Sequence, residues 1–142
     1  MSSDKELHVL IIPSWYPMYT GDIGGSFFRE QALALKSKGM KVGVIFPQAR
    51  SIKQVLSGLN GFEKGVDNGM STYRYGYIDV PKYKRFNQKM WLKRGEELFD
   101  LYVKENEKPD ILHAHSLFNG GLLANLLSQK YNIPFVITEH ST

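Results

Sequence analysis

The stretch VLIIPSWYPMYTGDIGGSFFREQALAL, residues 9–35, decides the fold because it joins a buried strand to a helix. The apolar run LHVLII, residues 7–12, is typical of a strand that is buried on both faces of a parallel sheet. A helix is predicted from Ser26 to Lys38, and Gly39 stands where a glycine commonly ends a helix. The connection between them is longer than the two to six residues of most strand-to-helix turns, so we expect it to hold a ligand.

The rest of the chain repeats this alternation of strands and helices. Further strands are predicted at residues 41–46, 71–80, 109–115 and 133–142, and further helices at about 87–106 and 117–131. Residues 47–69 are predicted to be a loop with one helical turn near 52–57 and a turn at 67–69 that could close a hairpin. This pattern predicts an α/β, Rossmann-like parallel sheet of strand order about 3-2-1-4-5, with helices on both faces.

Composition narrows the class of protein. The chain has 142 residues, of which 42% are apolar and 23% charged, as in an ordinary globular domain. It contains no cysteine, which excludes disulfides and thiolate metal sites. The polar start and the lack of a long apolar run predict neither a signal peptide nor a membrane span, so we expect a cytoplasmic location.

The positive charge is concentrated in PKYKRFNQKMWLKRG, residues 81–95, which has no acidic residue. We call this segment the basic segment. Aromatic residues alternate with its six cations, which are Lys82, Lys84, Arg85, Lys89, Lys93 and Arg94. Two interpretations stay open, a solvated helix start and a contact for an anionic surface such as lipid headgroups or a phosphorylated substrate. Nucleic acid is not expected as a partner because no known binding module frames the segment.

Polar residues follow three of the predicted strands. Gly24 and Gly25 end the long first connection, His115 and Ser116 follow the strand at 109–115, and Glu139 and His140 close the last strand. Because a parallel α/β sheet binds its ligands outside the carboxyl ends of the strands, we expect these residues to converge on one crevice. His8 and His113, by contrast, are expected to be structural. The histidines lack a carboxylate at metal-ligand spacing, so no metal site is predicted.

The paired glycines have a physical use. Two residues without Cβ let a ligand approach the backbone, and the N–H groups of the following helix favour an anion such as phosphate. The alternative is a flexible loop end. The spacing is neither the dinucleotide fingerprint nor a P-loop, which weakens the nicotinamide and ATPase interpretations.

Four motifs in register carry a family resemblance: PSWYP, GG-x-F-x-x-EQA-x-AL, PDILHAHS…GG-x-x-A and P-x-V-x-TEH. Together they resemble the N-terminal half of a family 4 glycosyltransferase of GT-B architecture, and the resemblance covers the whole chain. It implies transfer of a sugar, of the hexosyl type, from a nucleotide-sugar donor to a polysaccharide or glycolipid acceptor with retention of configuration.

The resemblance also implies roles for single residues. Gly24 and Gly25 would lie near the donor diphosphate, and His140 would lie at the reaction centre as the catalytic residue. His115, Ser116 and Glu139 would line the acceptor side. No metal or other cofactor is implied.

The family pattern continues beyond the length of this chain. We therefore expect residues 1–142 to be part of the N-terminal, acceptor-side domain, inactive without the C-terminal domain that binds most of the nucleotide. Such enzymes often work at the inner membrane face, which fits the basic segment. The alternative is a non-catalytic, flavodoxin-like module that binds an anionic ligand.

Overall fold

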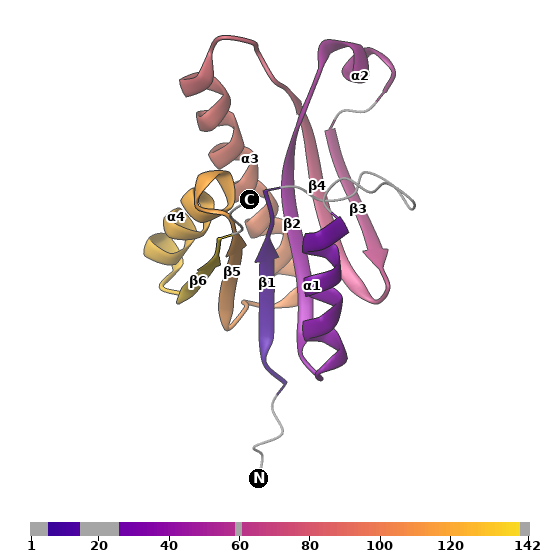
Figure 1. Cartoon of the computed structure of the whole chain (residues 1–142), viewed down its shortest axis with the longest axis vertical. Helices are drawn as coiled ribbons and strands as arrows, with labels where there is room; N and C mark the ends of the chain where they lie inside the picture. The colour runs from indigo at the N-terminus through magenta and orange to yellow at the C-terminus, as the bar shows by residue number, and fades with distance from the viewer. Residues whose placement is uncertain (1–5, 15–25, 59–60, 140–142) are drawn as a thin grey trace.

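The fold is built on one mixed sheet (Figure 1), seen in a computed structural model that describes residues 6–14, 26–58 and 61–139. Within these residues the sheet has six strands in the order β3-β4-β2-β1-β5-β6, and every neighbouring pair is parallel except β3 and β4. The strands are β1 (His8–Ile12), β2 (Lys41–Arg50), β3 (Gly61–Asp67), β4 (Met70–Ile78), β5 (Ile111–His115) and β6 (Phe135–Thr138). The predicted order is confirmed for the five parallel strands.

The helices lie on both faces of this sheet, as predicted. They are α1 (Ser26–Ser37), α2 (Ile52–Leu56), α3 (Lys84–Asn106) and α4 (Leu122–Tyr131), and a π-helical turn, η1 (Leu117–Gly121), precedes α4. Figure 1 shows α1 in front of β1 and β2, and α3 behind the sheet. Gly39 has a φ of +89°, and its N–H donates to the carbonyl of Lys36, so it ends α1 as the sequence predicts.

Residues 47–69 differ from the prediction of a loop. The helical turn is present as α2, but residues 61–67 form the edge strand β3, antiparallel to β4. Asn68 (φ +49°) and Gly69 (φ +85°) join the two strands through a tight turn that needs positive φ at both positions, as in a type I′ hairpin. The prediction missed β3 because most of its residues are exposed, which leaves no alternation of apolar and polar residues.

Strand β2 is also longer than predicted, since it continues through Pro47 to Arg50. A proline usually excludes a central strand because it lacks an N–H donor. Here Val44 is the last β2 residue paired with β1, so Pro47 has a neighbour on the β4 side only. The end of β2 therefore rises above the carboxyl end of β1 as a wall, together with β4 and the start of β3, as Figure 1 shows.

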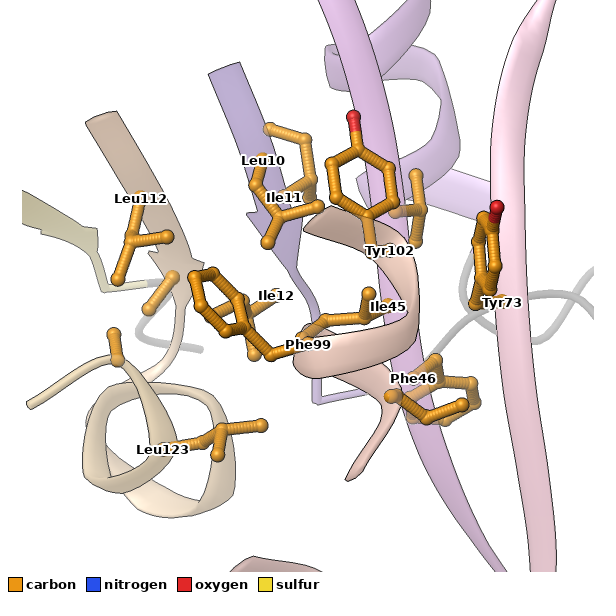
Figure 2. Close-up of a cluster of buried hydrophobic side chains, with 14 of the residues drawn as sticks. Leu10, Ile11, Ile12, Ile45, Phe46, Tyr73, Phe99, Tyr102, Leu112 and Leu123 are labelled. Atoms are coloured by element: carbon orange, nitrogen blue, oxygen red, sulfur yellow. The ribbon is translucent and has the colours of Figure 1, made fainter. Parts of the chain in front are cut away.

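The core lies between the sheet and the helices α3 and α4 (Figure 2). Leu10, Ile11 and Ile12 of β1 are completely buried, as expected for a central parallel strand. The ring of Tyr102 on α3 lies against Gly43, where a Cβ would be 2.1 Å from its hydroxyl oxygen. Gly43 therefore lets α3 approach the sheet closely and fixes the helix over β2.

Candidate active site at the carboxyl edge of the sheet

The carboxyl ends of β1, β5 and β6 are joined by backbone register and by two further hydrogen bonds. Ile12 pairs with Ala114, and His115 pairs with Thr138. The N–H of Ser116 donates to the carbonyl of Thr138 at 2.8 Å, and the Ser14 hydroxyl donates to the carbonyl of His115 at 2.8 Å. The three strand ends that the sequence predicts to converge therefore do converge.

The turn η1 covers this edge in a backbone conformation that is unusual for its residues. Ser116 has a φ of +80° and Asn119 a φ of +53°, in the left-handed region that L-residues seldom adopt. The turn is held by a bond from the N–H of Gly121 to the carbonyl of Ser116 and by one from the indole Nε1 of Trp91 to the carbonyl of Asn119. Backbone strain of this kind often accompanies functional sites.

Gly120 lets η1 approach the strand ends. A Cβ at this position would lie 2.6 Å from the carbonyl oxygen of Ile12 and 2.9 Å from that of His115. Both contacts are with backbone atoms, which cannot move aside as a flexible side chain can. A glycine is thus needed at residue 120 for η1 to sit over β1 and β5.

The predicted acceptor-side residues occupy different environments. The His115 side chain is completely buried, and its ring lies 4.7 Å from that of His113, measured between centroids. Ser116 is half-buried and Glu139 is exposed, so they are the two predicted residues here that a ligand can reach. His113 Nε2 and Thr138 Oγ1 are 2.6 Å apart, which agrees with the prediction of a hydrogen-bonded, structural histidine.

The predicted donor-side residues Gly24 and Gly25, and the predicted catalytic residue His140, lie outside the described residues. In the parts of the chain that are described, no three histidine or acidic side chains are grouped so as to hold a metal ion. The sequence analysis overlooked Ser14, Asn119 and Gly120. The GG-x-x-A motif contains Gly120, but its close approach to β1 depends on the tertiary structure.

His8 lies at the opposite, amino edge of the sheet and is structural, as predicted. Its Nε2 is 2.6 Å from the hydroxyl of Tyr102, and its backbone N–H donates to Asp110. Burial, assisted by the nearby Lys41 cation, lowers the pKa of His8 below its ordinary value of 6.5. The ring is therefore neutral at pH 7 and packs as part of the core.

The basic segment forms the start of α3 and the turn before it. Five of its cations are exposed, and they are Lys82, Lys84, Arg85, Lys89 and Lys93. Tyr83 and Phe86 between them are 63% and 49% exposed. Apolar rings that are exposed among cations can contact a surface that is both apolar and anionic.

Two residues of the basic segment belong to the fold instead. Arg94 donates to Glu97 at 2.7 Å and stacks over the ring of Tyr75 at 4.6 Å, so it is engaged within the protein. Trp91 is buried in the core. None of the helices in the described ranges has the length and apolar character needed to cross a bilayer.

Comparison with known proteins gives a consistent family. The family model described as Glycosyltransferase Family 4 matches residues 24–142. A Bacillus subtilis (strain 168) protein named as a teichuronic acid biosynthesis glycosyltransferase, TuaC, is 26% identical over 147 aligned positions, which cover 96% of this chain and 36% of that protein.

Three solved structures share the fold. The catalytic domain of starch synthase IV from Arabidopsis thaliana, bound to ADP and acarbose, has a TM-score of 0.63 and 16% identity, over 96% of this chain and 34% of that one. LpCGTa in complex with UDP has a TM-score of 0.59 and 16% identity, over 97% and 31%. A trehalose-6-phosphate protein from E. coli bound with UDP-2-fluoro glucose has a TM-score of 0.52 and 12% identity, over 92% and 32%.

The chain spans about a third of the length of each of these proteins. The resemblance seen in the sequence motifs is confirmed by the family model and by the shared fold of the GT-B structures. This chain belongs to glycosyltransferase family 4.

Proposed function

We propose that this chain forms the acceptor-side wall of a retaining glycosyltransferase, which moves a hexosyl group from a nucleotide sugar to an acceptor. The observation that carries the proposal is the carboxyl edge, where η1 holds Ser116 at a φ of +80° beside the joined ends of β5 and β6. A turn held rigidly in a strained conformation can position an acceptor hydroxyl without reorganising during the reaction.

The donor side of the proposal rests on the sequence motifs. Gly24 and Gly25 bind the donor diphosphate, and His140 lies at the reaction centre. The starch synthase structure holds ADP, the LpCGTa structure holds UDP, and the E. coli structure holds UDP-2-fluoro glucose, which supports a nucleotide-sugar donor for a chain of the same fold. We propose that most of the nucleotide binds to a C-terminal domain and that no metal ion is needed.

We propose a polysaccharide or glycolipid acceptor at the inner membrane face. The similarity to a protein named for teichuronic acid biosynthesis supports a polymeric acceptor. The exposed Tyr83 and Phe86 among five exposed cations support peripheral contact with an anionic membrane.

The test uses the full-length protein that contains this chain. It is assayed for transfer from a panel of UDP- and ADP-hexoses to cell-envelope acceptors, and the anomeric configuration of the product is read by NMR. We expect transfer with retention, an unchanged rate in EDTA, and a loss of at least about a hundredfold in kcat for His140→Ala, which removes a positioned catalytic group. Residues 1–142 alone should transfer no sugar.

Circular dichroism of His140→Ala serves as the control for folding. An inverted product would overturn retention, a rate abolished by EDTA would overturn the metal-free mechanism, and an unchanged kcat in His140→Ala would remove that residue from catalysis. Failure to turn over any nucleotide sugar would contradict the enzymatic proposal as a whole.

A further inference from the structure

Arg50, the last residue of β2, has a buried guanidinium with unused hydrogen-bond donors. The residue is only 4% exposed. Its Nη2 donates to the side-chain oxygen of Gln48 at 2.7 Å, but its Nε and Nη1 are buried and have no hydrogen-bond partner. Three of the five N–H donors of this side chain are carried by those two nitrogens.

A buried guanidinium with unused N–H donors would be stabilised by a bound anion. Burial lowers the pKa of Arg50, but an arginine side chain stays protonated at neutral pH, so the positive charge remains. A buried charge is strongly unfavourable unless it is paired and hydrogen-bonded. The Glu63 carboxylate on β3 acts on Arg50 through the electrostatic field alone, because it forms no hydrogen bond with the two unused nitrogens.

The strands that pair with the end of β2 do not supply the missing hydrogen-bond partners of Arg50. Gln48 and Arg50 are two residues apart on β2 and therefore lie on the same face of that strand. Across the sheet Gln48 pairs with Gly76, which pairs with Gly61, so the row beside Gln48 offers no side chain to the guanidinium.

The position relates Arg50 to the candidate active site. It ends the part of β2 that rises beyond the carboxyl end of β1, roughly five residues or 16 Å above the level at which β1 stops. It therefore belongs to the same edge of the sheet as Ser116 and η1. Because the donor diphosphate is assigned to the glycines of the first connection, a second anion at this edge would belong to the acceptor.

We propose that Arg50, oriented by Gln48, binds an oxyanion of the acceptor, either a phosphate or a sugar carboxylate. The assignment to the acceptor rests on the proposed glycosyl transfer, whereas the anion site itself does not. Phosphate and carboxylate share the chemistry that a guanidinium recognises, since both accept charge-assisted N–H bonds in one plane.

The first experiment measures anion binding by residues 1–142 in the absence of donor. Thermal unfolding is followed at constant ionic strength while chloride is replaced by inorganic phosphate or by glucuronate. We expect at least one of the two oxyanions to raise the Tm of the wild type. Arg50→Met should bind that anion at least about tenfold more weakly, and Arg50→Lys should fall between the two because it keeps the charge but loses the planar fork.

Lys53→Gln is the matched control, since Lys53 lies three residues further along, on α2, and is exposed. It removes the same charge and should leave the response to anion unchanged. In chloride, Arg50→Met should unfold at the same Tm as the wild type or higher, because it removes an unpaired buried charge. A lower Tm would show that the guanidinium is structural, and a response retained in Arg50→Met would overturn the site.

The response also identifies the anion. A shift with phosphate alone assigns a phosphorylated acceptor, and a shift with glucuronate alone assigns an acidic sugar. No shift with either would overturn the proposal.

A second experiment separates this proposal from the proposed function. In the full-length enzyme, Arg50→Met should raise the KM for the acceptor at least about tenfold and leave the KM for the donor unchanged. If the enzyme transfers no sugar while the anion response persists in residues 1–142, the anion site stands and its assignment to an acceptor falls. If transfer is normal and the acceptor KM is unchanged, the assignment is likewise overturned.

Discussion

The amino ends and the carboxyl ends of the parallel strands, here the amino edge and the carboxyl edge of the sheet, differ in how their polar side chains are hydrogen-bonded. At the amino edge, polar side chains satisfy one another: His8 meets Tyr102, Tyr73 bonds to Glu105 and Asn106, and Asn106 also accepts from Ser71. At the carboxyl edge, Arg50 keeps two buried nitrogens without hydrogen bonds.

The difference separates an edge whose polar groups stabilise the fold from an edge that is suited to binding a ligand. A satisfied buried network contributes to a unique native structure. Unpaired buried polar groups cost stability, and proteins commonly retain them where a ligand binds. Changes at the amino edge should thus affect stability, whereas changes at the carboxyl edge should also affect binding.

The largest effect is expected for Gly120→Ala. The new Cβ would lie 2.6 Å from the Ile12 carbonyl oxygen and 2.9 Å from that of His115, so η1 must move away from the strand ends. Overpacking against backbone should reduce the free energy of unfolding by about 2–4 kcal/mol, measured by urea denaturation. Transfer by the full-length enzyme should fall with it.

Gly65→Ala is the matched control for this change. Gly65 lies on the exposed edge strand β3, and a Cβ there would have no neighbour within 4 Å. Its free energy of unfolding should stay within about 0.5 kcal/mol of wild type. Equal stabilities for the two variants would contradict the close packing of η1.

A smaller effect is expected at the start of α3, which lies on the side of the sheet where the parallel strands end. Replacing Lys84, Arg85, Lys89 and Lys93 with Gln in the full-length protein should weaken co-sedimentation with phosphatidylserine vesicles at least about tenfold, since each cation near an anionic surface contributes up to about 1 kcal/mol. The variant keeps Arg94, which is engaged with Glu97 and Tyr75.

The control variant replaces four exposed lysines outside the basic segment, namely Lys38, Lys53, Lys104 and Lys108. It has the same net charge as the first variant but should bind vesicles as the wild type does. Equal loss in both variants would mean that total charge determines binding, and no loss in either would leave the start of α3 as a solvated helix.

Much of this architecture could be predicted from the sequence because periodicity and strand-helix alternation are local signals. These signals correctly predicted the five parallel strands and the ends of α1, and the positions of His8 and His113 in the strands predicted their structural roles. The two elements that were wrongly predicted depend on neighbours. Strand β3 is paired by β4 while mostly exposed, and β2 passes through Pro47 because β1 stops below it.

The candidate site could be predicted only as a location. Strand ends of a parallel sheet must share an edge, so the convergence of Ser116 and Glu139 followed from topology. The burial of His115 and the approach of Gly120 to Ile12 depend on how η1 packs, which no local pattern records. Arg50 could not be identified from the sequence either, because the lack of hydrogen bonds to its Nε and Nη1 is visible only in the folded structure.

The smallest effect, a dependence of stability on pH, tests the amino edge. Because the pKa of His8 is lowered in the folded state, the unfolded chain binds a proton first as the pH falls. The contribution of neutral His8 is therefore complete above about pH 6.5, the ordinary pKa of histidine, and is lost progressively below it. We expect the Tm of the wild type to fall by a few degrees between pH 7.5 and 5.5, and His8→Asn should reduce that slope.

Tyr102→Phe identifies the partner in this pH dependence. It removes the hydroxyl that lies 2.6 Å from His8 Nε2 and should lower the free energy of unfolding at pH 7.5 by about 1–2 kcal/mol, because a buried ring nitrogen loses its hydrogen bond. Tyr83→Phe, at an exposed position, is the control and should have no effect. The relevant quantity is the difference in slope between wild type and His8→Asn. An equal slope in the two proteins would show that His8 keeps its ordinary pKa, and the amino edge would then owe its stability to the tyrosine and asparagine bonds alone.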